Sequence, residues 1–246
     1  SEKAKKIYKI IDSSYPTNKG KFFYADLSLQ RDIFKVYKKI EANYKKIDIL
    51  INNAGAIFSK RQITNEGIEK TFALNHMSYF SLSNLFLRIM ESESRIINVA
   101  SGAHLNATIN FDDLYRSKNY SFGWGAYAQS KLCNILFSYF LSKKIYSKNI
   151  SVNCLHPGLV NSNFGDNNSF LFSNVFKLIK NFYGISEQKG SETIIYLASD
   201  SKFSNNTGSY YVKKIKSRSS LISFEESYQK KLWSISEKIF QKYCKE

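Results

Sequence analysis

The sequence has little proline, glycine and cysteine, and it has no long apolar run. Its 246 residues include two prolines, Pro16 and Pro157, eleven glycines and three cysteines. So few prolines and glycines, together with 43% hydrophobic residues, exclude a low-complexity chain and indicate a packed interior. At this length we predict one globular domain that spans residues 1–246.

The cysteines and histidines follow no pattern typical of a disulfide or metal site. Cys133, Cys154 and Cys244 contain no CxxC pair and are odd in number, so neither a disulfide framework nor a zinc site is predicted. The three histidines are too far apart to bind a metal from one helix. No apolar run reaches the ~18 residues that a membrane span requires. We therefore expect a cytoplasmic location, no membrane span in this chain and no metal.

Acidic residues are scarce relative to basic ones. The chain has 36 lysines and arginines against 20 acidic residues, which gives a formal net charge of +16 at pH 7. Such a charge attracts polyanions, and both nucleotide phosphates and nucleic acid qualify. The lysines fall in scattered pairs, however, and no nucleic-acid motif accompanies them. We interpret them as a solvated basic exterior and predict no specific nucleic-acid partner.

Strand-like and helix-like segments alternate along the chain. Strands are predicted at residues 21–25, 47–51, 95–100, 150–155 and 208–212. Helices are predicted at residues 2–11, 28–40, 65–90, 123–140, 171–182, 187–198 and 224–243. This alternation predicts an α/β fold with a doubly wound parallel sheet, and ligands are expected at the carboxyl ends of its strands. The last helix could pack on the sheet or on another subunit.

The stretch GWGAYAQSKLCNILFSYF, residues 123–140, places a phenol and an amine at the start of an amphipathic helix. Tyr127 and Lys131 are four residues apart and therefore share one helical face. A charged lysine close to a phenol favours the phenolate, so the pair should lower the Tyr127 pKa from ~10 toward a working pH. Such a pair standing alone would more often be a surface tyrosine beside a solvated lysine.

Four of the expected strands end in small or polar residues. These ends are Asp26-Leu27, Asn52-Asn53-Ala54-Gly55, Ala100-Ser101-Gly102 and Pro157-Gly158-Leu159. At one edge of a parallel sheet they would line one crevice. There Gly55 and Gly158 would let the backbone approach a flat ligand, and Ser101 could bind a carbonyl or carbinol oxygen beside Tyr127.

In their order and spacing, these motifs resemble those of the short-chain dehydrogenase/reductase family along the whole chain. The motifs are NNAG at residues 52–55, LNHMSYF with Asn75, NVASGAH with Ser101, YAQSK with Tyr127 and Lys131, and HPGLVNS at residues 156–162. The retinol-dehydrogenase-like branch is the most similar. Three features point to it: NHMSYF, a long interval between Ser101 and Tyr127 that contains FDDLY, and the KKLWSISEKI segment near the end.

The resemblance implies a Rossmann-like fold and hydride transfer between a nicotinamide nucleotide and an apolar alcohol or carbonyl compound. Tyr127 would be the general acid for reduction and the general base for oxidation, while Ser101 would orient the substrate oxygen. Lys131 would lower the Tyr127 pKa and bind the nicotinamide ribose, and Asn75 would hold a water molecule of the proton relay.

The cofactor implied by the resemblance is NADP or NAD, with NADP frequent in this branch. Asp26 and Leu27 would lie at the adenine, and Asn53, Ala54 and Gly55 at the adenine ribose. The residues implied at the nicotinamide are Pro157, Gly158, Leu159 and Ser162. Tyr127 and Lys131 would complete the cofactor contacts.

The sequence departs from the family pattern at its start. The family opens with a strand, a glycine-rich TGxxxGxG turn that holds the pyrophosphate, and a second strand that distinguishes NAD from NADP. This sequence contains no such unit, so we expect a domain without its first strand-helix-strand unit. One explanation is an incomplete gene model, favoured because the catalytic residues remain. The alternative is a truncated, non-catalytic protein with a binding or interaction role.

Two further expectations concern the substrate and the assembly. Residues 163–183 are rich in Phe and Asn and would form an apolar lid or, equally well, an ordinary amphipathic helix. The apolar residues concerned are Phe164, Phe170, Leu171, Phe172 and Phe176. Related enzymes often pair through helices beside the one that carries the tyrosine, so the resemblance also implies a homodimer.

Overall fold

The centre of the structure is a five-stranded sheet whose strands lie side by side in chain order. It is seen in a computed structural model that describes residues 2–14, 20–161, 184–204 and 206–244. The strands are β1 (Ile49–Asn52), β2 (Arg95–Val99), β3 (Ser151–His156), β4 (Ser209–Val212) and β5 (Ile215–Ser217). The first four run parallel, and β5 is antiparallel to β4. The four parallel strands confirm most of the sheet that the sequence predicts.

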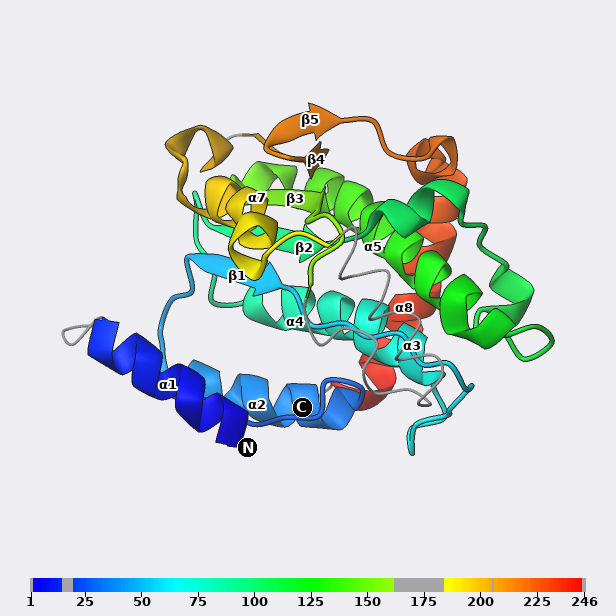
Figure 1. Cartoon of the computed structure of the whole chain (residues 1–246), viewed down its shortest axis with the longest axis horizontal. Helices are drawn as coiled ribbons and strands as arrows, with labels where there is room; N and C mark the ends of the chain where they lie inside the picture. Colours follow the sequence, from blue (N-terminus) through cyan, green and yellow to red (C-terminus); the bar gives the residue numbers. More distant parts are fainter. Residues whose placement is uncertain (1, 15–19, 162–183, 205, 245–246) are drawn as a thin grey trace.

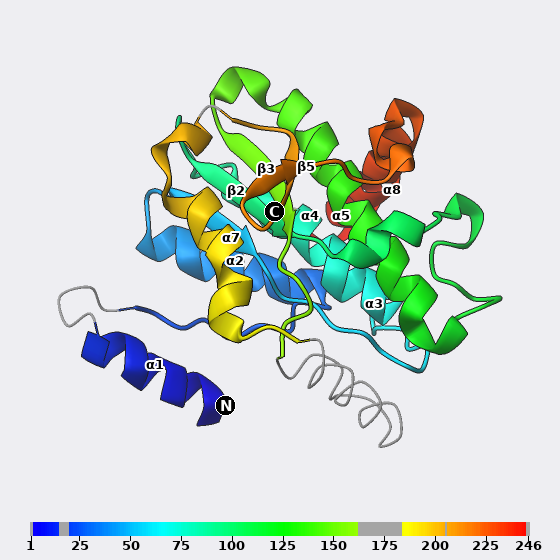
Figure 2. The ribbon, with the colours of Figure 1, turned by 45° about the horizontal axis from the view of Figure 1, so that its top comes forward.

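Helices cover both faces of this sheet (Figure 1). The helical elements are α1 (Glu2–Ser14), α2 (Gln30–Asn43), α3 (Lys70–Phe72), a π-helical turn (Ala73–Met77), α4 (Ser78–Phe86), α5 (Trp124–Lys144), α7 (Glu187–Ser199) and α8 (Glu226–Tyr243). Figure 2 shows α7 on one face of the sheet and α4 and α5 on the other. Helix α8 packs against α5, so the second face carries two layers of helices. This arrangement is Rossmann-like.

Alternate residues of the central strands face opposite helix layers, as the pleat of a strand requires. On one face, Ile96 of β2 and Val152 of β3 are fully buried in the cluster that contains Leu132 of α5. On the other face, Ile97 and Leu155 pack with Leu197 of α7. Because both faces are covered, apolar side chains of the central strands point to both helix layers.

Two asparagines interrupt this apolar pattern because they bond to each other across the strands. Asn52 and Asn98 are register partners, and the Asn52 amide donates to the Asn98 carbonyl oxygen at 2.8 Å. Asn98 donates in turn to Ser138 of α5 at 2.9 Å, and Asn52 donates to Ser83 of α4 at 3.1 Å. These bonds give the Asn52 and Asn98 Nδ2 groups acceptors and tie β1 and β2 to the helix layer.

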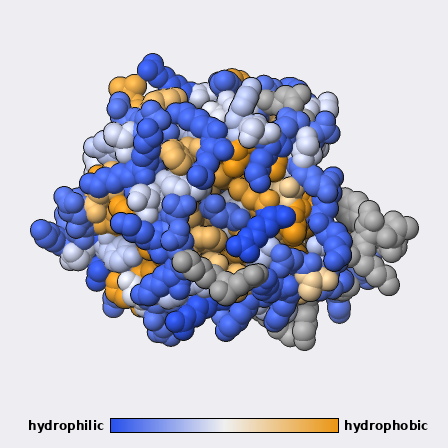
Figure 3. Space-filling view, turned by 180° about the vertical axis from the view of Figure 1, so that it is seen from behind, coloured by the Kyte–Doolittle hydropathy of each residue, from blue (hydrophilic) through white to orange (hydrophobic). Residues whose placement is uncertain are grey.

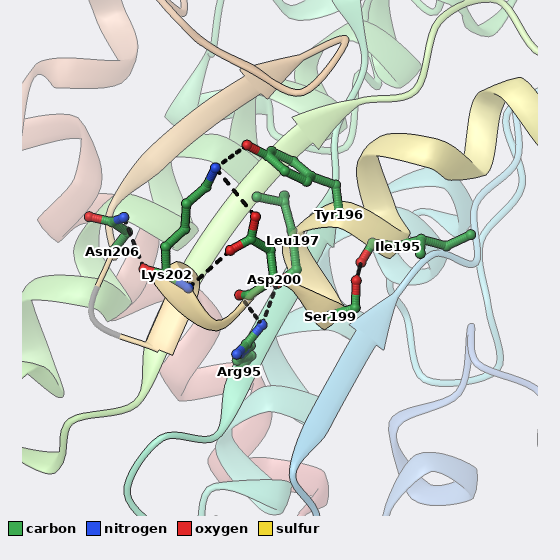
Figure 4. Close-up of polar contacts among 8 residues, drawn as sticks. All are labelled: Arg95, Ile195, Tyr196, Leu197, Ser199, Asp200, Lys202 and Asn206. Carbon is green, nitrogen blue, oxygen red and sulfur yellow. Dashed lines mark hydrogen bonds and ion pairs between the residues drawn. The ribbon is translucent and has the colours of Figure 1, made fainter.

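An arginine on β2 fixes the C-terminal end of α7 (Figure 4). Arg95 Nη1 donates to three backbone carbonyls, those of Leu197 at 3.1 Å, Ala198 at 2.7 Å and Asp200 at 2.8 Å. The last carbonyls of a helix have no partner within the helix and carry partial negative charge, so a guanidinium stabilises them well. Lys202 adds an ion pair with Asp200 at 3.4 Å. Helix α7 is thereby held against β2.

Helix α5 is buried on almost all sides rather than on the single apolar stripe expected of it. The sheet covers one side of the helix, and α8 covers another. Trp233 of α8 packs its ring against those of Phe137 and Phe140 on α5 and against Phe80 on α4. Thus α8 packs on this helix layer rather than on the sheet, and its packing on another subunit stays a prediction.

The predicted strand at residues 21–25 is wrong. Residues 20–26 have no regular secondary structure, and β1 is the outer strand of the described sheet. The aromatic residues Phe22, Phe23 and Tyr24 favour a strand locally, but a strand also needs a hydrogen-bonded neighbour. A neighbour is a matter of tertiary structure, and the local pattern does not supply it.

The predicted helix over residues 65–90 begins later and ends earlier than expected. Residues up to Glu69 form a turn in which Gly67 has a φ of 78°. The Glu69 carboxylate then accepts hydrogen bonds from Thr71 N and Phe72 N, both at 2.8 Å, and so caps the helix at its start. The sequence also missed β5, which follows β4 through a turn at Lys213 and Lys214.

The exterior is largely hydrophilic, with apolar side chains gathered near the middle of the face shown in Figure 3. None of the helices in the described part of the chain combines the length and apolar character needed to cross a bilayer. The helix expected at residues 171–182 and the lid expected at 163–183 lie outside the described residues, as does Ser162.

Candidate active site

The carboxyl ends of β1, β2 and β3 meet at one edge of the sheet because these strands are parallel and in register. Asn52 pairs with Asn98, and Val99 pairs with Leu155. The segments that follow the three strands therefore lie at this edge. They carry Asn53–Gly55, Ser101 and Pro157–Leu159, as the sequence predicts for the crevice.

Ser101, Tyr127 and Lys131 come together where β2 ends against the first turns of α5. The Ser101 side chain and the Tyr127 phenol are hydrogen-bonded. The Lys131 Nζ lies 5.8 Å from the centroid of the Tyr127 ring. Tyr127 is 8% exposed and Lys131 is 3% exposed. A hydroxyl, a phenol and an amine thus share one site, and the phenol and the amine are almost inaccessible to solvent.

The Lys131 amine is fixed by two groups outside its own helix. Its Nζ donates to the backbone carbonyl oxygen of Val99 at 2.9 Å. It also lies over the ring of Tyr79, 5.4 Å from the ring centroid. Within the described ranges, Lys131 forms no ion pair, so the carbonyl dipole and the aromatic rings are its polar surroundings.

Burial dominates the protonation of this site. It raises the pKa of Tyr127 to about 12, although the hydrogen bond with Ser101 opposes part of that rise. It lowers the pKa of Lys131 to about 7. The sequence predicted a lowered tyrosine pKa, and here the pKa is raised. A lysine that is only partly charged near neutral pH attracts a phenolate too weakly to compensate its desolvation.

Asn75 is fully buried in the π-helical turn that precedes α4. Its Oδ1 accepts from Ala56 N at 2.9 Å, and its Nδ2 donates to the Ala56 carbonyl oxygen at 2.8 Å. Nδ2 also donates to Ser130 Oγ at 3.0 Å, and Ser130 in turn donates to the Tyr127 carbonyl oxygen at 2.7 Å. Asn75 therefore joins the segment after β1 to the turn of α5 that carries Tyr127.

The Ser101 backbone is held by a histidine whose tautomer follows from its contacts. His104 Nε2 accepts from Ser220 N at 3.2 Å, so the ring proton is on Nδ1, which donates to the Ser101 carbonyl oxygen at 2.6 Å. Burial lowers the His104 pKa and keeps the ring neutral near pH 7. This contact fixes the backbone of Ser101, whose side chain is hydrogen-bonded to Tyr127.

Two glycines bring the backbone close to side chains at this edge of the sheet. A Cβ at Gly55 would lie 3.2 Å from Asn75 Oδ1 and 3.3 Å from Lys131 Nζ. Gly158 has a φ of 95°, and a Cβ there would lie 2.7 Å from Ile185 Cδ1. A larger residue at either place would crowd these side chains, so both glycines allow close packing of the segments that follow β1 and β3. The Lys131 amine and the Ser101 and Tyr127 hydroxyls nearby are hydrogen-bonding groups that fit a nicotinamide riboside.

The residues expected at the adenine end are in a different environment. Asp26 and Asn53 are exposed, whereas Tyr127 and Lys131 are buried. The Asp26 Oδ1 accepts hydrogen bonds from Ser28 N at 2.9 Å and Ser28 Oγ at 2.7 Å, which fixes the carboxylate in a local turn. Leu27 and Ala54, like Gly55, Pro157, Gly158 and Leu159, are partly buried.

Sequence reasoning missed Ser130 and Tyr79. Ser130 stands directly before Lys131 in the YAQSK motif, and its buried hydroxyl could have been noticed there. Tyr79 lies four residues after Asn75, but the π-helical turn between them alters the usual facing of such residues. The chain pattern alone gives no signal for its contact with Lys131.

Comparison with known proteins gives the family. The family model for short chain dehydrogenases matches residues 1–169. Human retinol dehydrogenase 14 is 34% identical over 216 residues, which cover 86% of this chain and 64% of that protein. Human polyprenol dehydrogenase is 30% identical over 249 residues, which cover 95% of this chain and 73% of that protein. The chain thus spans under two thirds of retinol dehydrogenase 14.

A likeness to solved structures agrees with the fold. The structure of angucycline C-6 ketoreductase LanV with bound NADP superposes with a TM-score of 0.62, at 22% identity, over 83% of this chain and 79% of that one. The matched family model and the dehydrogenase relatives, together with the Rossmann-like sheet, lead to one conclusion. The chain belongs to the short-chain dehydrogenase/reductase family, in its retinol-dehydrogenase-like branch.

Proposed function

We propose that this protein transfers a hydride between a nicotinamide nucleotide and an apolar alcohol or carbonyl compound. The observation that carries the proposal is the hydrogen-bonded pair of Ser101 and Tyr127 beside the buried amine of Lys131. A bound nicotinamide nucleotide would supply or accept the hydride. The chain would supply the proton, the orientation of the substrate oxygen and a site from which water is excluded.

Each side chain has a role that its surroundings support. In the reduction direction, the Ser101 hydroxyl holds the substrate oxygen, and Tyr127 donates its phenolic proton to that oxygen. A pKa of about 12 keeps Tyr127 protonated before the step, which suits a proton donor at neutral pH. Lys131 stabilises the phenolate that remains. It also binds the nicotinamide ribose next to Gly55, while Asn75 keeps the segment after β1 against α5.

The proposal of an apolar substrate is supported by a half-exposed aromatic ring beside Tyr127. Trp124 precedes Tyr127 by one helical turn, its ring centroid is 5.9 Å from that of Tyr127, and about half of its surface is exposed. It offers an apolar wall beside the reacting oxygen. Two of the relatives are named for the apolar alcohols retinol and polyprenol. We therefore expect faster turnover of long-chain or isoprenoid substrates than of small polar ones.

The test is oxidation of NADPH or NADH, followed by nicotinamide absorbance, with retinal, a long-chain aldehyde and a small polar aldehyde. Tyr127→Phe should lower turnover by about 100-fold or more, because general acid catalysis is worth ~10²–10⁴-fold. Tyr139→Phe is the matched control. Tyr139 is also buried on α5, but its hydroxyl bonds to Ser219 at 2.8 Å, so this variant should keep its activity.

Turnover that is unaffected by Tyr127→Phe would refute the assigned roles. Calorimetry with NADPH and NADH distinguishes the proposed enzyme from the alternative of a non-catalytic protein. Tight binding of either nucleotide would remove that alternative, and the two titrations would also give the preference between the nucleotides.

A further inference from the structure

Tyr79 is an aromatic residue on α4 that the proposed reaction leaves without a role. It is 1% exposed, and its ring lies under the Lys131 Nζ with a separation of 5.4 Å from the ring centroid. Its hydroxyl donates to the Val99 carbonyl oxygen at 3.4 Å, the same oxygen that accepts from Lys131 at 2.9 Å. The ring and the carbonyl therefore define where the amine lies.

We propose that Tyr79 is a positioning residue, which keeps Lys131 charged and directed at the Tyr127 ring by presenting the face of its own ring to the amine. The proposal rests on the proposed function for its importance to turnover. It names a residue outside the set Asn75, Ser101, Tyr127 and Lys131.

The physical reason is that a buried ammonium needs a favourable partner. Burial favours the neutral amine of Lys131, and no carboxylate among the described residues pairs with it to oppose this. The face of an aromatic ring attracts a cation through its quadrupole, and this attraction strengthens when water is excluded. Tyr79 and Tyr127 are the titratable groups that face Lys131, from α4 and from α5. Both phenols are neutral near pH 7, so the ring faces provide the attraction.

The ring rather than the hydroxyl of Tyr79 carries this role. The hydroxyl shares its acceptor with Lys131 and makes the longer of the two bonds. Tyr79→Phe keeps the ring and leaves the Val99 carbonyl entirely to Lys131. Tyr79→Leu removes the ring face and leaves an apolar side chain, so the two variants separate the two parts of the residue.

The direct measurement is the titration of Tyr127 and Lys131 by NMR of protein labelled with ¹³C at the tyrosine ζ carbon, without nucleotide or substrate. Tyr127→Phe assigns the Tyr127 resonance, and Lys131→Met identifies the inflection that comes from the neighbouring amine. We expect this inflection near pH 7 in the unmodified protein and in Tyr79→Phe. In Tyr79→Leu it should fall by about one pH unit, since loss of a cation–π contact disfavours the charged amine.

Two further variants guard against a merely structural effect. Tyr79→Met also removes the ring face but fills more of the space than Leu. It should lower the pH of the inflection by the same amount. It replaces Tyr79→Leu in the test if that variant does not fold. Phe80→Leu removes a neighbouring buried ring that packs on Trp233, and it should leave the inflection unchanged. An unchanged inflection in folded Tyr79→Leu or Tyr79→Met would overturn the proposal.

The pH profile of turnover gives a second, independent readout. If Lys131 must be charged, turnover declines as the pH rises through its pKa, and Tyr79→Leu should move this decline to lower pH while Tyr79→Phe keeps it in place. Because the NMR titration needs no catalysis, an inactive chain with the expected shift would refute the proposed function alone. An active chain without the shift would refute the role of Tyr79 alone.

Discussion

Strands β1 and β2 carry isoleucines in the same row of the sheet but in different surroundings. Ile51 and Ile97 are register partners, yet Ile51 is 43% exposed and Ile97 is 1% exposed. Helix α7 covers Ile97, whereas β1 is the outer strand of the described sheet. The β2 strand, which precedes Ser101, is therefore covered on this face, and the β1 strand, which precedes Asn53, is partly open to solvent. The place of a strand in the sheet, rather than its residue types, makes this difference.

The largest difference in stability between the two strands is expected when each isoleucine is replaced in turn. Ile97→Ala should lower the free energy of unfolding by about 3 kcal/mol, because it leaves a cavity among well-packed side chains. Ile51→Ala should lower it by less than about 1 kcal/mol, because much of the side chain is already in water. Urea unfolding of both variants measures the difference. Equal losses would mean that the β1 side is as well enclosed as the β2 side.

A second comparison uses two glycines with similar backbone conformations. Gly123, which begins α5, has a φ of 82°, and a Cβ there would collide with the Phe58 carbonyl oxygen. Gly67 has a φ of 78° and no atom within 4 Å of the corresponding position. Gly123→Ala should cost about 3 kcal/mol, from backbone strain plus overpacking, and Gly67→Ala about 1 kcal/mol from strain alone. Thermal and urea unfolding would show the ranking, and a reversed order would contradict the packing at the start of α5.

The smallest effect concerns the open side, where α2 is held by a distant carboxylate. Glu66 accepts from the backbone N–H groups of Gln30 at 2.7 Å and Arg31 at 3.0 Å, at the N-terminus of α2. Glu66→Ala should cost about 1 kcal/mol, because two helix N–H groups and the favourable end charge lose their partner. Glu66→Gln keeps one acceptor oxygen and should cost less. An unchanged free energy of unfolding in Glu66→Ala would show that water molecules bind these N–H groups as well as the carboxylate does.

What could be predicted from the sequence was local. The four-residue spacing of Tyr127 and Lys131 fixes their common helical face, and the apolar runs before Asn52 and Ala100 indicate buried strands. These features depend on neighbours in the chain, and they also carry the family resemblance.

What the sequence could not provide depends on distant parts of the chain. Residues 21–25 look like a strand but have no place in the described sheet. The direction of the Tyr127 pKa shift depends on how completely α5 is enclosed. The contact between Tyr79 and Lys131 depends on how α4 packs on α5, and neither spacing nor composition encodes that packing directly.

The π-helical turn at Ala73–Met77 holds one residue more than a regular helical turn would. Removing one residue from it would restore a regular helix and rotate everything on one side by about 100° relative to the other. When this chain is aligned with a homologue whose helix is regular here, the single-residue gap therefore belongs inside this turn. A gap placed elsewhere would match either Asn75 or Tyr79 to the wrong counterpart.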